Sequence, residues 1–173
     1  MFMRSSYIIN EYFMYMKGHY DRHGKLCTHV TETCNTFIVD KSPLEILEDS
    51  ICVIGYDLRG AIATSKKLLG NIYHCPILVN PILRIIVFPT KSAWHDECVW
   101  YNPIHIKRTN SLNRKTTITY SNGKTHNISA KLTSFNSKIK TAEQLDDITK
   151  VSAYPSTSRS NHSLVSEKKD DYT

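Results

Sequence analysis

FPTKSAWHDECVWYNPIHIKRTNSLNRKTTITYSNGKT, residues 88–125, is the stretch of sequence that decides the fold. It contains two segments in which apolar and polar residues alternate, and this period of two predicts strands over residues 104–109 and 116–120. The dipeptide Asn122-Gly123 predicts a tight hairpin between the second strand and residues 124–128. We expect a type I′ turn there, because that turn needs positive φ at both central residues.

Cations are expected on one side of this β surface. In the strand that begins at Ile104, Ile104 and Ile106 should face the core, while His105 and Lys107 should face solvent. Lys124 follows the hairpin tip, where its side chain can reach past the body of the protein. This pattern indicates that the surface binds a polyanion rather than a small substrate.

The rest of the chain predicts a β-rich α+β domain. Ser42, Pro43 and Glu45 predict the start of a short helix that runs into a strand. Asp57 predicts the N-cap of a second helix over residues 58–69. We expect a single domain of mainly antiparallel hairpins with two short helices, and its other strands are predicted over residues 7–16, 26–31, 36–39, 51–54, 76–79, 84–88 and 98–101.

The composition changes near residue 142. Residues 142–173 are rich in Ser, Thr and charged residues and contain few aromatics. We therefore expect residues 1–141 to form the folded domain and residues 142–173 to form a tail that is largely disordered after a short helix at its start.

The positive charge is concentrated in the middle of the chain. The net charge is +6, but residues 51–145 alone carry thirteen Lys and Arg against four Asp and Glu. Clustered cations focus a field that attracts phosphates. Arg59, Lys66 and Lys67 fall on the exposed face of the second predicted helix, where the alternative reading is an ordinary solvated surface.

The cysteines and the apolar segments indicate an intracellular protein. The five cysteines are widely spaced and form no C-x-x-C pair, which fits reduced thiols in a cytosol. No apolar run approaches the roughly 20 residues that span a bilayer. The first residues lack the features of a signal peptide, so we expect a cytoplasmic protein.

The sequence lacks a convincing catalytic or cofactor motif. The single His/Cys groups at residues 74–75 and 95–98 contain metal-ligand types but not the two close pairs of a zinc site. Neither a phosphate-binding nor a dinucleotide-binding glycine motif is present. We expect no enzyme activity, no cofactor and no metal, and we place Cys98, Phe88 and Trp100 in the core.

The remaining chemistry is a cationic surface for nucleic acid. Lys and Arg neutralise phosphates and release counterions, which sets affinity without reading sequence. Side chains at loop tips can enter a narrow, A·T-rich minor groove. The sequence leaves His105 open as a DNA contact or a polar strand residue. The candidate DNA-binding residues are Arg59, Lys66, Lys67, His105, Lys107, Arg108, Asn122 and Lys124.

At these residues the chain resembles the bacterial competence transcription factor family (ComK). The resemblance covers residues 24–135, and it rests on an ordered set of short matches rather than on one motif. The matches are GKLC at 24–27, PLEI at 43–46, residues 50–55, PILVNP at 76–81, FPT at 88–90, Cys98, Trp100, His105-Ile106 and YSNGKT at 120–125.

The resemblance implies a sequence-specific activator of the genes for DNA uptake and natural transformation. Members of the family bind pairs of A·T-rich boxes mainly through the minor groove, as dimers that associate into tetramers, and they help RNA polymerase engage. It also implies a cytoplasmic, nucleoid-associated protein of a Gram-positive bacterium.

The chain departs from the family pattern in two places. His95 and Asp96 stand where a Bacillus-type relative has arginine and proline. After residue 135 the segment that recognises a degradation adaptor has no match, so the sequence does not predict an adaptor or protease partner.

Two other functions stay open at this point. A single-stranded nucleic-acid-binding β module requires Tyr101 and Tyr120 on the same open face as the lysines, since exposed aromatics stack on bases. A non-DNA interaction protein would bind an acidic partner through its basic surface and would show no preference among duplexes.

Overall fold

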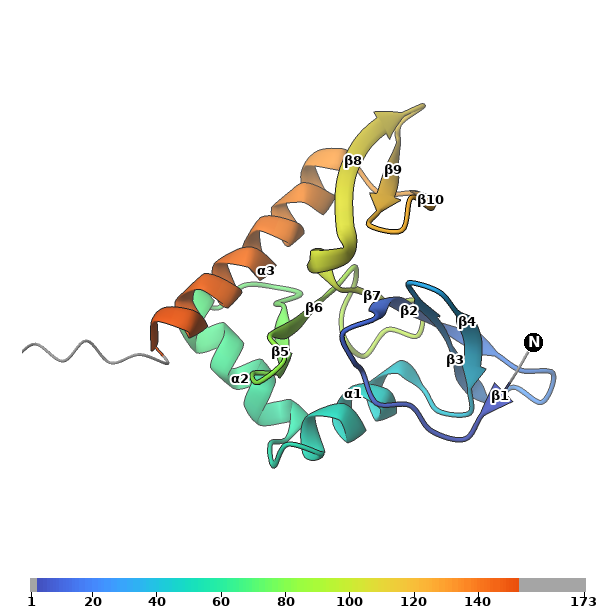
Figure 1. Ribbon diagram of the computed structural model, residues 1–173, viewed down its shortest axis with the longest axis horizontal. Helices are drawn as coiled ribbons and strands as arrows, with labels where there is room; N and C mark the ends of the chain where they lie inside the picture. The colour runs from blue at the N-terminus through green and yellow to red at the C-terminus, as the bar shows by residue number, and fades with distance from the viewer. Residues whose placement is uncertain (1–2, 153–173) are drawn as a thin grey trace, which may run out of the picture.

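Two β-sheets and three α-helices make up the described part of the chain. The computed structural model describes residues 3–152 and places ten strands and three α-helices in them (Figure 1). The overall class, β-rich α+β, is as the sequence predicts. The expectation of two short helices is wrong, because a third helix, α3 (Leu132–Ser152), is the longest in the described chain.

The larger sheet has seven strands. It is antiparallel throughout except at its β1 edge, where β1 pairs with β4 in parallel. In spatial order its strands are β1 (Met3–Arg4), β4 (Thr36–Val39), β3 (Leu26–Glu32), β2 (Phe13–Tyr20), β7 (Val99–Tyr101), β6 (Ile85–Pro89) and β5 (Ile77–Asn80).

The smaller sheet has three antiparallel strands from the second half of the chain. A short 3-10 turn, η1 (Pro103–His105), leads into it from β7. Its strands are β8 (Ile106–Leu112), β9 (Lys115–Tyr120) and β10 (Thr125–Ile128), with β9 in the centre. The strands follow one another along the chain, so two tight turns build the whole sheet.

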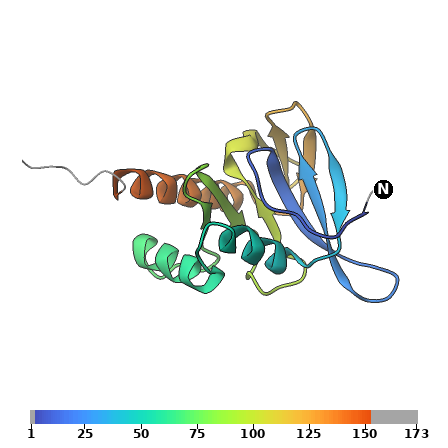
Figure 2. The ribbon, with the colours of Figure 1, turned by 60° about the horizontal axis from the view of Figure 1, so that its bottom comes forward.

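Both early helices begin as their capping residues predict. In α1 (Pro43–Cys52) the Ser42 and Glu45 side chains cap each other's backbone amides. The bonds that the Ser42 amide and hydroxyl donate to the Glu45 carboxylate hold its pKa below its usual value. In α2 (Leu58–Leu69) the Asp57 carboxylate accepts from the Gly60 amide at 2.7 Å. The two helices lie next to each other, below α3 in Figure 2.

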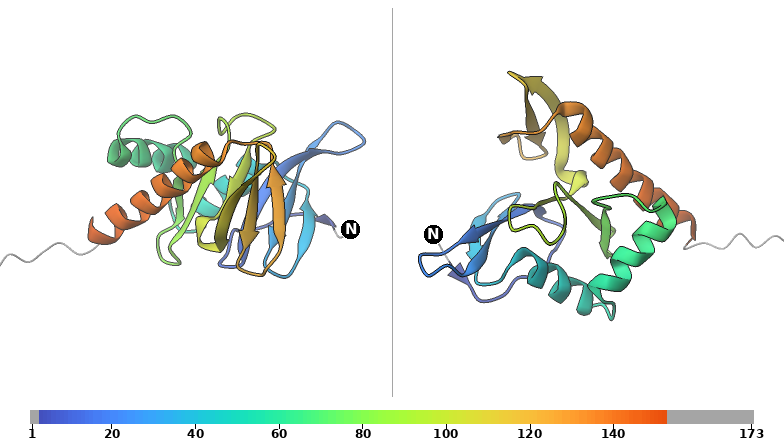
Figure 3. Two further views of the ribbon diagram at one scale, coloured as in Figure 1. Left: turned by 90° about the horizontal axis from the view of Figure 1, so that it is seen from above. Right: turned by 180° about the vertical axis from the view of Figure 1, so that it is seen from behind.

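The central strands of the seven-stranded sheet, β2, β7 and β6, are covered on both faces. The residues of β2, β6 and β7 are divided between two clusters: Phe13 and Trp100 pack toward α1 and α2, whereas Met14 and Tyr101 pack toward the three-stranded sheet and α3. This double burial explains why β6 is an unbroken apolar run whose five residues are all buried. Figure 3 shows the three-stranded sheet in front of the seven-stranded one.

Several sequence predictions differ from the structure in detail. Residues 51–54 do not form a strand, because α1 continues through Cys52 and a turn follows. The strand predicted over residues 7–16 begins only at Phe13. Ile104 does not face the core: it lies in η1 and is 74% exposed. The predicted boundary at residues 141/142 falls within α3, and residues 153–173 lie outside the described part.

The sequence predicts only a short helix after residue 142, and most of α3 was missed because its apolar face is narrow. Phe135, Ala142 and Leu145 are buried at helical spacing, but Ser, Thr, Asn, Lys and Asp fill most other positions. Its packing against the sheets includes polar contacts: the Thr109 hydroxyl donates a hydrogen bond to the Asn136 side-chain oxygen at 2.7 Å. A window of sequence with so little amphipathic contrast resembles a polar tail.

His126 should make stability depend on pH in the mildly acidic range. Its ring stacks on Tyr15 with centroids 5.4 Å apart, and burial, aided by the charge of Lys17, lowers its pKa. The His126 imidazole therefore binds a proton more readily in the unfolded chain than in the folded one. As a result, the free energy of unfolding falls as pH drops below about 6.5. His126→Phe keeps a ring at this position, and urea unfolding between pH 5 and pH 7 should show a shallower pH slope.

The exposed His23 in the β2–β3 turn provides the control. His23→Gln should leave the slope as it is. His29 and His74 also have lowered pKa values through burial, so part of the slope should remain in His126→Phe. Equal slopes in the His126→Phe and unmodified proteins would contradict this assignment.

Candidate nucleic-acid interface

The three-stranded sheet has one buried face and one open face. On β9, Thr116, Ile118 and Tyr120 are buried, and the residues between them point the other way. The strand register brings residues of β8 and β10 onto the same outer side. We call this the open face, and it consists of Arg108, Asn110, Leu112, Lys115, Thr117, Thr119, Thr125 and Asn127.

Positive charge in this part of the chain is not balanced by carboxylates. Between Cys98 and Ala142 the sequence has eight Lys and Arg and no Asp or Glu. All ion pairs found within residues 3–152 involve other cations. An excess of positive charge of this kind creates an electrostatic field that attracts phosphates. The eight residues are Lys107, Arg108, Arg114, Lys115, Lys124, Lys131, Lys138 and Lys140.

Lys138 differs from the other seven because it is half-buried. Its ammonium donates to the Pro89 carbonyl at 3.2 Å, and burial lowers its pKa. Its contact with β6 ties α3 to the seven-stranded sheet. We therefore regard Lys138 as a structural residue.

The turn between β8 and β9 is the tight type I′ turn, and sequence reasoning missed it. Asn113 (φ 49°) and Arg114 (φ 61°) are both left-handed, and they join the paired residues Leu112 and Lys115. The dipeptide lacks the glycine that usually marks this turn. Arg114 and Lys115 were accordingly absent from the predicted contacts, although the alternation of residues on both sides pointed to a connection here.

The turn between β9 and β10 has a different geometry from the one predicted. Only Gly123 has positive φ, at 81°, so this is not a type I′ turn. The Gly123 amide donates to the Tyr120 carbonyl at 3.0 Å, and the Tyr120 amide donates to the Lys124 carbonyl at 2.9 Å. Residues 121–123 therefore form a three-residue loop in which glycine takes the left-handed position.

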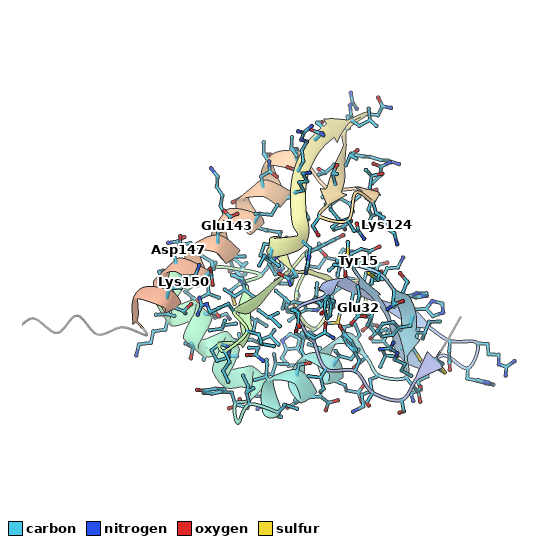
Figure 4. All side chains as sticks on the ribbon, in the orientation of Figure 1. Tyr15, Glu32, Lys124, Glu143, Asp147 and Lys150 are labelled. Atoms are coloured by element: carbon cyan, nitrogen blue, oxygen red, sulfur yellow. The ribbon has the colours of Figure 1, made fainter. Side chains whose placement is uncertain are left out.

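Asn122 fastens this loop to the larger sheet. Its amide nitrogen donates to the Thr33 carbonyl at 2.7 Å, and its oxygen accepts from the Lys124 amide at 3.1 Å. Thr33 follows β3, so the bond joins the two sheets. Lys124 itself is exposed, and Figure 4 shows it beside Tyr15, close to the seven-stranded sheet.

His105 has a partner for each ring nitrogen. Nε2 lies 2.7 Å from the Glu11 carbonyl, and Nδ1 lies 3.1 Å from the Ser121 hydroxyl. Because a carbonyl can only accept, Nε2 carries the proton and Nδ1 accepts from Ser121 in the neutral ring. These bonds make His105 a link between η1, the N-terminal segment and the β9–β10 loop.

Lys107 and Arg108 lie at the outer edge of the three-stranded sheet, next to α3. The chain bulges between Ile106 and Arg108, and this places Lys107 outside the regular alternation. A groove of about 270 Å³ runs between β8 and α3. It is lined by Ile106, Lys107, Arg108, Thr109, Asn136, Ile139, Lys140 and Glu143.

The structure does not bring the predicted α2 cations to this surface. Arg59, Lys66 and Lys67 are exposed, as expected for the polar side of an amphipathic helix. However, α2 lies at the corner of the molecule away from the three-stranded sheet, beside the C-terminal half of α3 (Figures 1 and 3). The eight predicted contact residues therefore divide into two separate groups.

The predicted core residues are buried, and so are the two tyrosines that the single-strand alternative requires on an open face. Phe88, Trp100 and Cys98 are at most 1% exposed. Tyr101 and Tyr120 are equally buried, so they do not lie on an open face with the lysines. The exposed aromatic rings found in residues 3–152 lie outside the three-stranded sheet: Tyr12, Tyr20, Tyr56, Tyr73 and Trp94.

Residues 3–152 contain neither a metal-binding cluster nor a membrane-spanning helix. No group of three or more His, Cys, Asp or Glu side chains there could hold a metal ion. None of the helices in the same range is long and apolar enough to cross a membrane. The five cysteines are free, and burial raises the pKa of Cys27, Cys75 and Cys98.

Comparisons with known proteins agree on one family. The family model described as ComK protein matches residues 4–152. The "Competence transcription factor" of Bacillus subtilis (strain 168) is 30% identical over 117 residues, which are 67% of this chain and 61% of that protein. The alignment therefore spans about three fifths of that relative's length. No solved structure matches the chain.

The roles of Asn122 and Lys124 should separate in unfolding experiments. Asn122→Ala removes the bond to the Thr33 carbonyl, and we expect the free energy of unfolding to fall by about 1 kcal/mol. Lys124→Ala removes an exposed cation and should change that energy by less than about 0.5 kcal/mol. Urea denaturation followed by circular dichroism measures both, and equal losses in the two variants would contradict the anchoring role of Asn122.

Proposed function

This chain belongs to the ComK protein family, and we propose that it is a transcription regulator of competence that binds double-stranded DNA through the three-stranded sheet. The observation that carries the proposal is the group of cations on and around the open face, of which Arg108 and Lys115 lie on the face itself. Seven exposed or partly exposed Lys and Arg lie on or beside this sheet, along a stretch of sequence without a carboxylate. Phosphates are the ligands that such a surface attracts most strongly.

We propose A·T-rich promoter DNA as the target, as the family resemblance implies. The narrow minor groove of A·T tracts has an enhanced negative potential that attracts Arg and Lys side chains. The polar open face adds Thr and Asn side chains, which bond phosphate and sugar oxygens and so fix the register of a protein on the duplex.

A duplex is favoured over a single strand by the position of the aromatic residues. Binding of single strands depends on rings that stack on successive bases. Tyr101 and Tyr120 are buried in the core and are not available for stacking. An acidic protein partner remains the contrasting hypothesis, and it differs from the proposal in predicting no preference among duplexes.

Self-association and contact with RNA polymerase in the bacterial cytoplasm belong to the proposal as well. For self-association, the β10 edge of the three-stranded sheet offers the better surface. Its residues, Thr125, His126, Asn127 and Ile128, include no Lys, Arg, Asp or Glu, whereas the β8 edge carries Lys107 and Arg108. An edge without such charges accepts a second strand without repulsion.

Binding to DNA should depend on the open face and not on α2. We expect the double variant Arg108→Ala with Lys115→Ala to bind an A·T-rich duplex more weakly. The slope of log binding constant against log salt concentration should fall in magnitude by about two, because each lost phosphate contact lowers it by about one. Fluorescence anisotropy across a salt series measures both effects.

The matched control removes the same charge from α2. Lys66→Ala with Lys67→Ala should leave the slope nearly unchanged, since these side chains lie at another corner of the molecule. The same series with G·C-rich duplexes and single strands tests the target. Equal affinity for all three nucleic acids, or a larger loss in the α2 variant, would contradict the proposal.

A further inference from the structure

The tip of the β8–β9 hairpin (residues 111–115) stands clear of the rest of the molecule. All five residues are exposed, and Figure 1 shows the hairpin projecting beyond α3 and the larger sheet. Within residues 3–152, the Arg114 side chain makes no hydrogen bond and no ion pair. Folding therefore gives no direct reason for an arginine at this position.

The backbone conformation at residue 114 also disfavours an arginine. Its φ of 61° is left-handed, a region that costs roughly 1 kcal/mol for a residue with a Cβ and almost nothing for glycine. Asn at the first central position suits a type I′ turn, and Gly is the usual second residue. Non-glycine residues held in this region tend to be found where function needs the side chain.

The chemistry around the tip is suited to a groove of duplex DNA. Two paired strands are about 4.8 Å apart before their side chains are added, so the body of the hairpin is too wide for a minor groove of about 6 Å. A single side chain extending from the turn is narrow enough. Leu112, an apolar residue 56% exposed among cations, lies beside the turn and can contact sugars or base edges.

We infer that Arg114 enters a groove of the bound duplex and determines base preference, while Arg108 and Lys115 on the open face hold neighbouring phosphates. This inference rests on the proposed function. Lys124 lies at the other end of β9, about 20 Å from Arg114 for a six-residue strand, so it belongs to a different part of the contact surface. Arg114 thus becomes the specificity residue of the interface.

Arg114→Gly separates this role from a structural one. Glycine suits the left-handed turn better, so the unfolding temperature should stay the same or rise. The ratio of affinities for A·T-rich over G·C-rich duplexes should fall by about tenfold, the effect of losing one base contact. Lys115→Ala is the control, and it should weaken binding to both duplexes by the same factor.

Other results would overturn either the inference about Arg114 or the proposed function. A lower unfolding temperature in Arg114→Gly would make Arg114 a structural residue, and an unchanged affinity ratio would remove it from base reading; either result overturns the inference. Both leave the proposed function intact if the unmodified protein still prefers A·T-rich duplex. Failure of the unmodified protein to bind any duplex would instead overturn the proposed function.

Discussion

Aromatic rings packed between the seven-stranded sheet, the three-stranded sheet and α3 fix the orientation of these three parts. Tyr15 stacks on Tyr120 with centroids 5.5 Å apart, and Tyr101 meets Phe135 edge-on at 5.3 Å. Such pairs add about 0.5–1.5 kcal/mol each beyond the burial of their area. The packing buries even the Tyr120 hydroxyl, which has no hydrogen-bond partner within the described residues, and burial raises the pKa of that phenol.

The open face is a direct consequence of this packing. Because Ile118 and Tyr120 point into the aromatic cluster, the alternation of a strand directs Lys115, Thr117 and Thr119 outward. The bonds of Asn122 and His105 then hold the loop and the 3-10 turn against the larger sheet. The contacts that stabilise the fold therefore also expose the cations to solvent. Repulsion between these cations lowers the stability of the folded state, and burial of the core offsets that loss.

The sequence was most informative where local chemistry decides the structure. Asp57 caps α2 as predicted, because an N-cap depends on a few neighbouring residues. The turn at Asn113 and Arg114 could not be predicted in this way: without glycine, only the pairing of the flanking strands forces it. The role of His105 depends on Glu11, which lies 94 residues away in the chain.

The α3 helix and the separation of the cations into two groups also depend on contacts between distant parts of the chain, which local sequence patterns do not reveal. Phe135 and Leu145 become core residues only when both sheets are in place, and the cations of α2 and β8 look alike in a charge count. Only the fold assigns them to different corners of the molecule.

Hydrogen exchange with and without an A·T-rich duplex tests the central claim most directly. If the three-stranded sheet is the interface, backbone amides of β8, of β9 and of the turn at residues 113–114 should exchange more slowly in the complex. Those of α2 (Leu58–Leu69) should not change. Protection confined to α2, with the β8–β9 hairpin unaffected, would contradict the account.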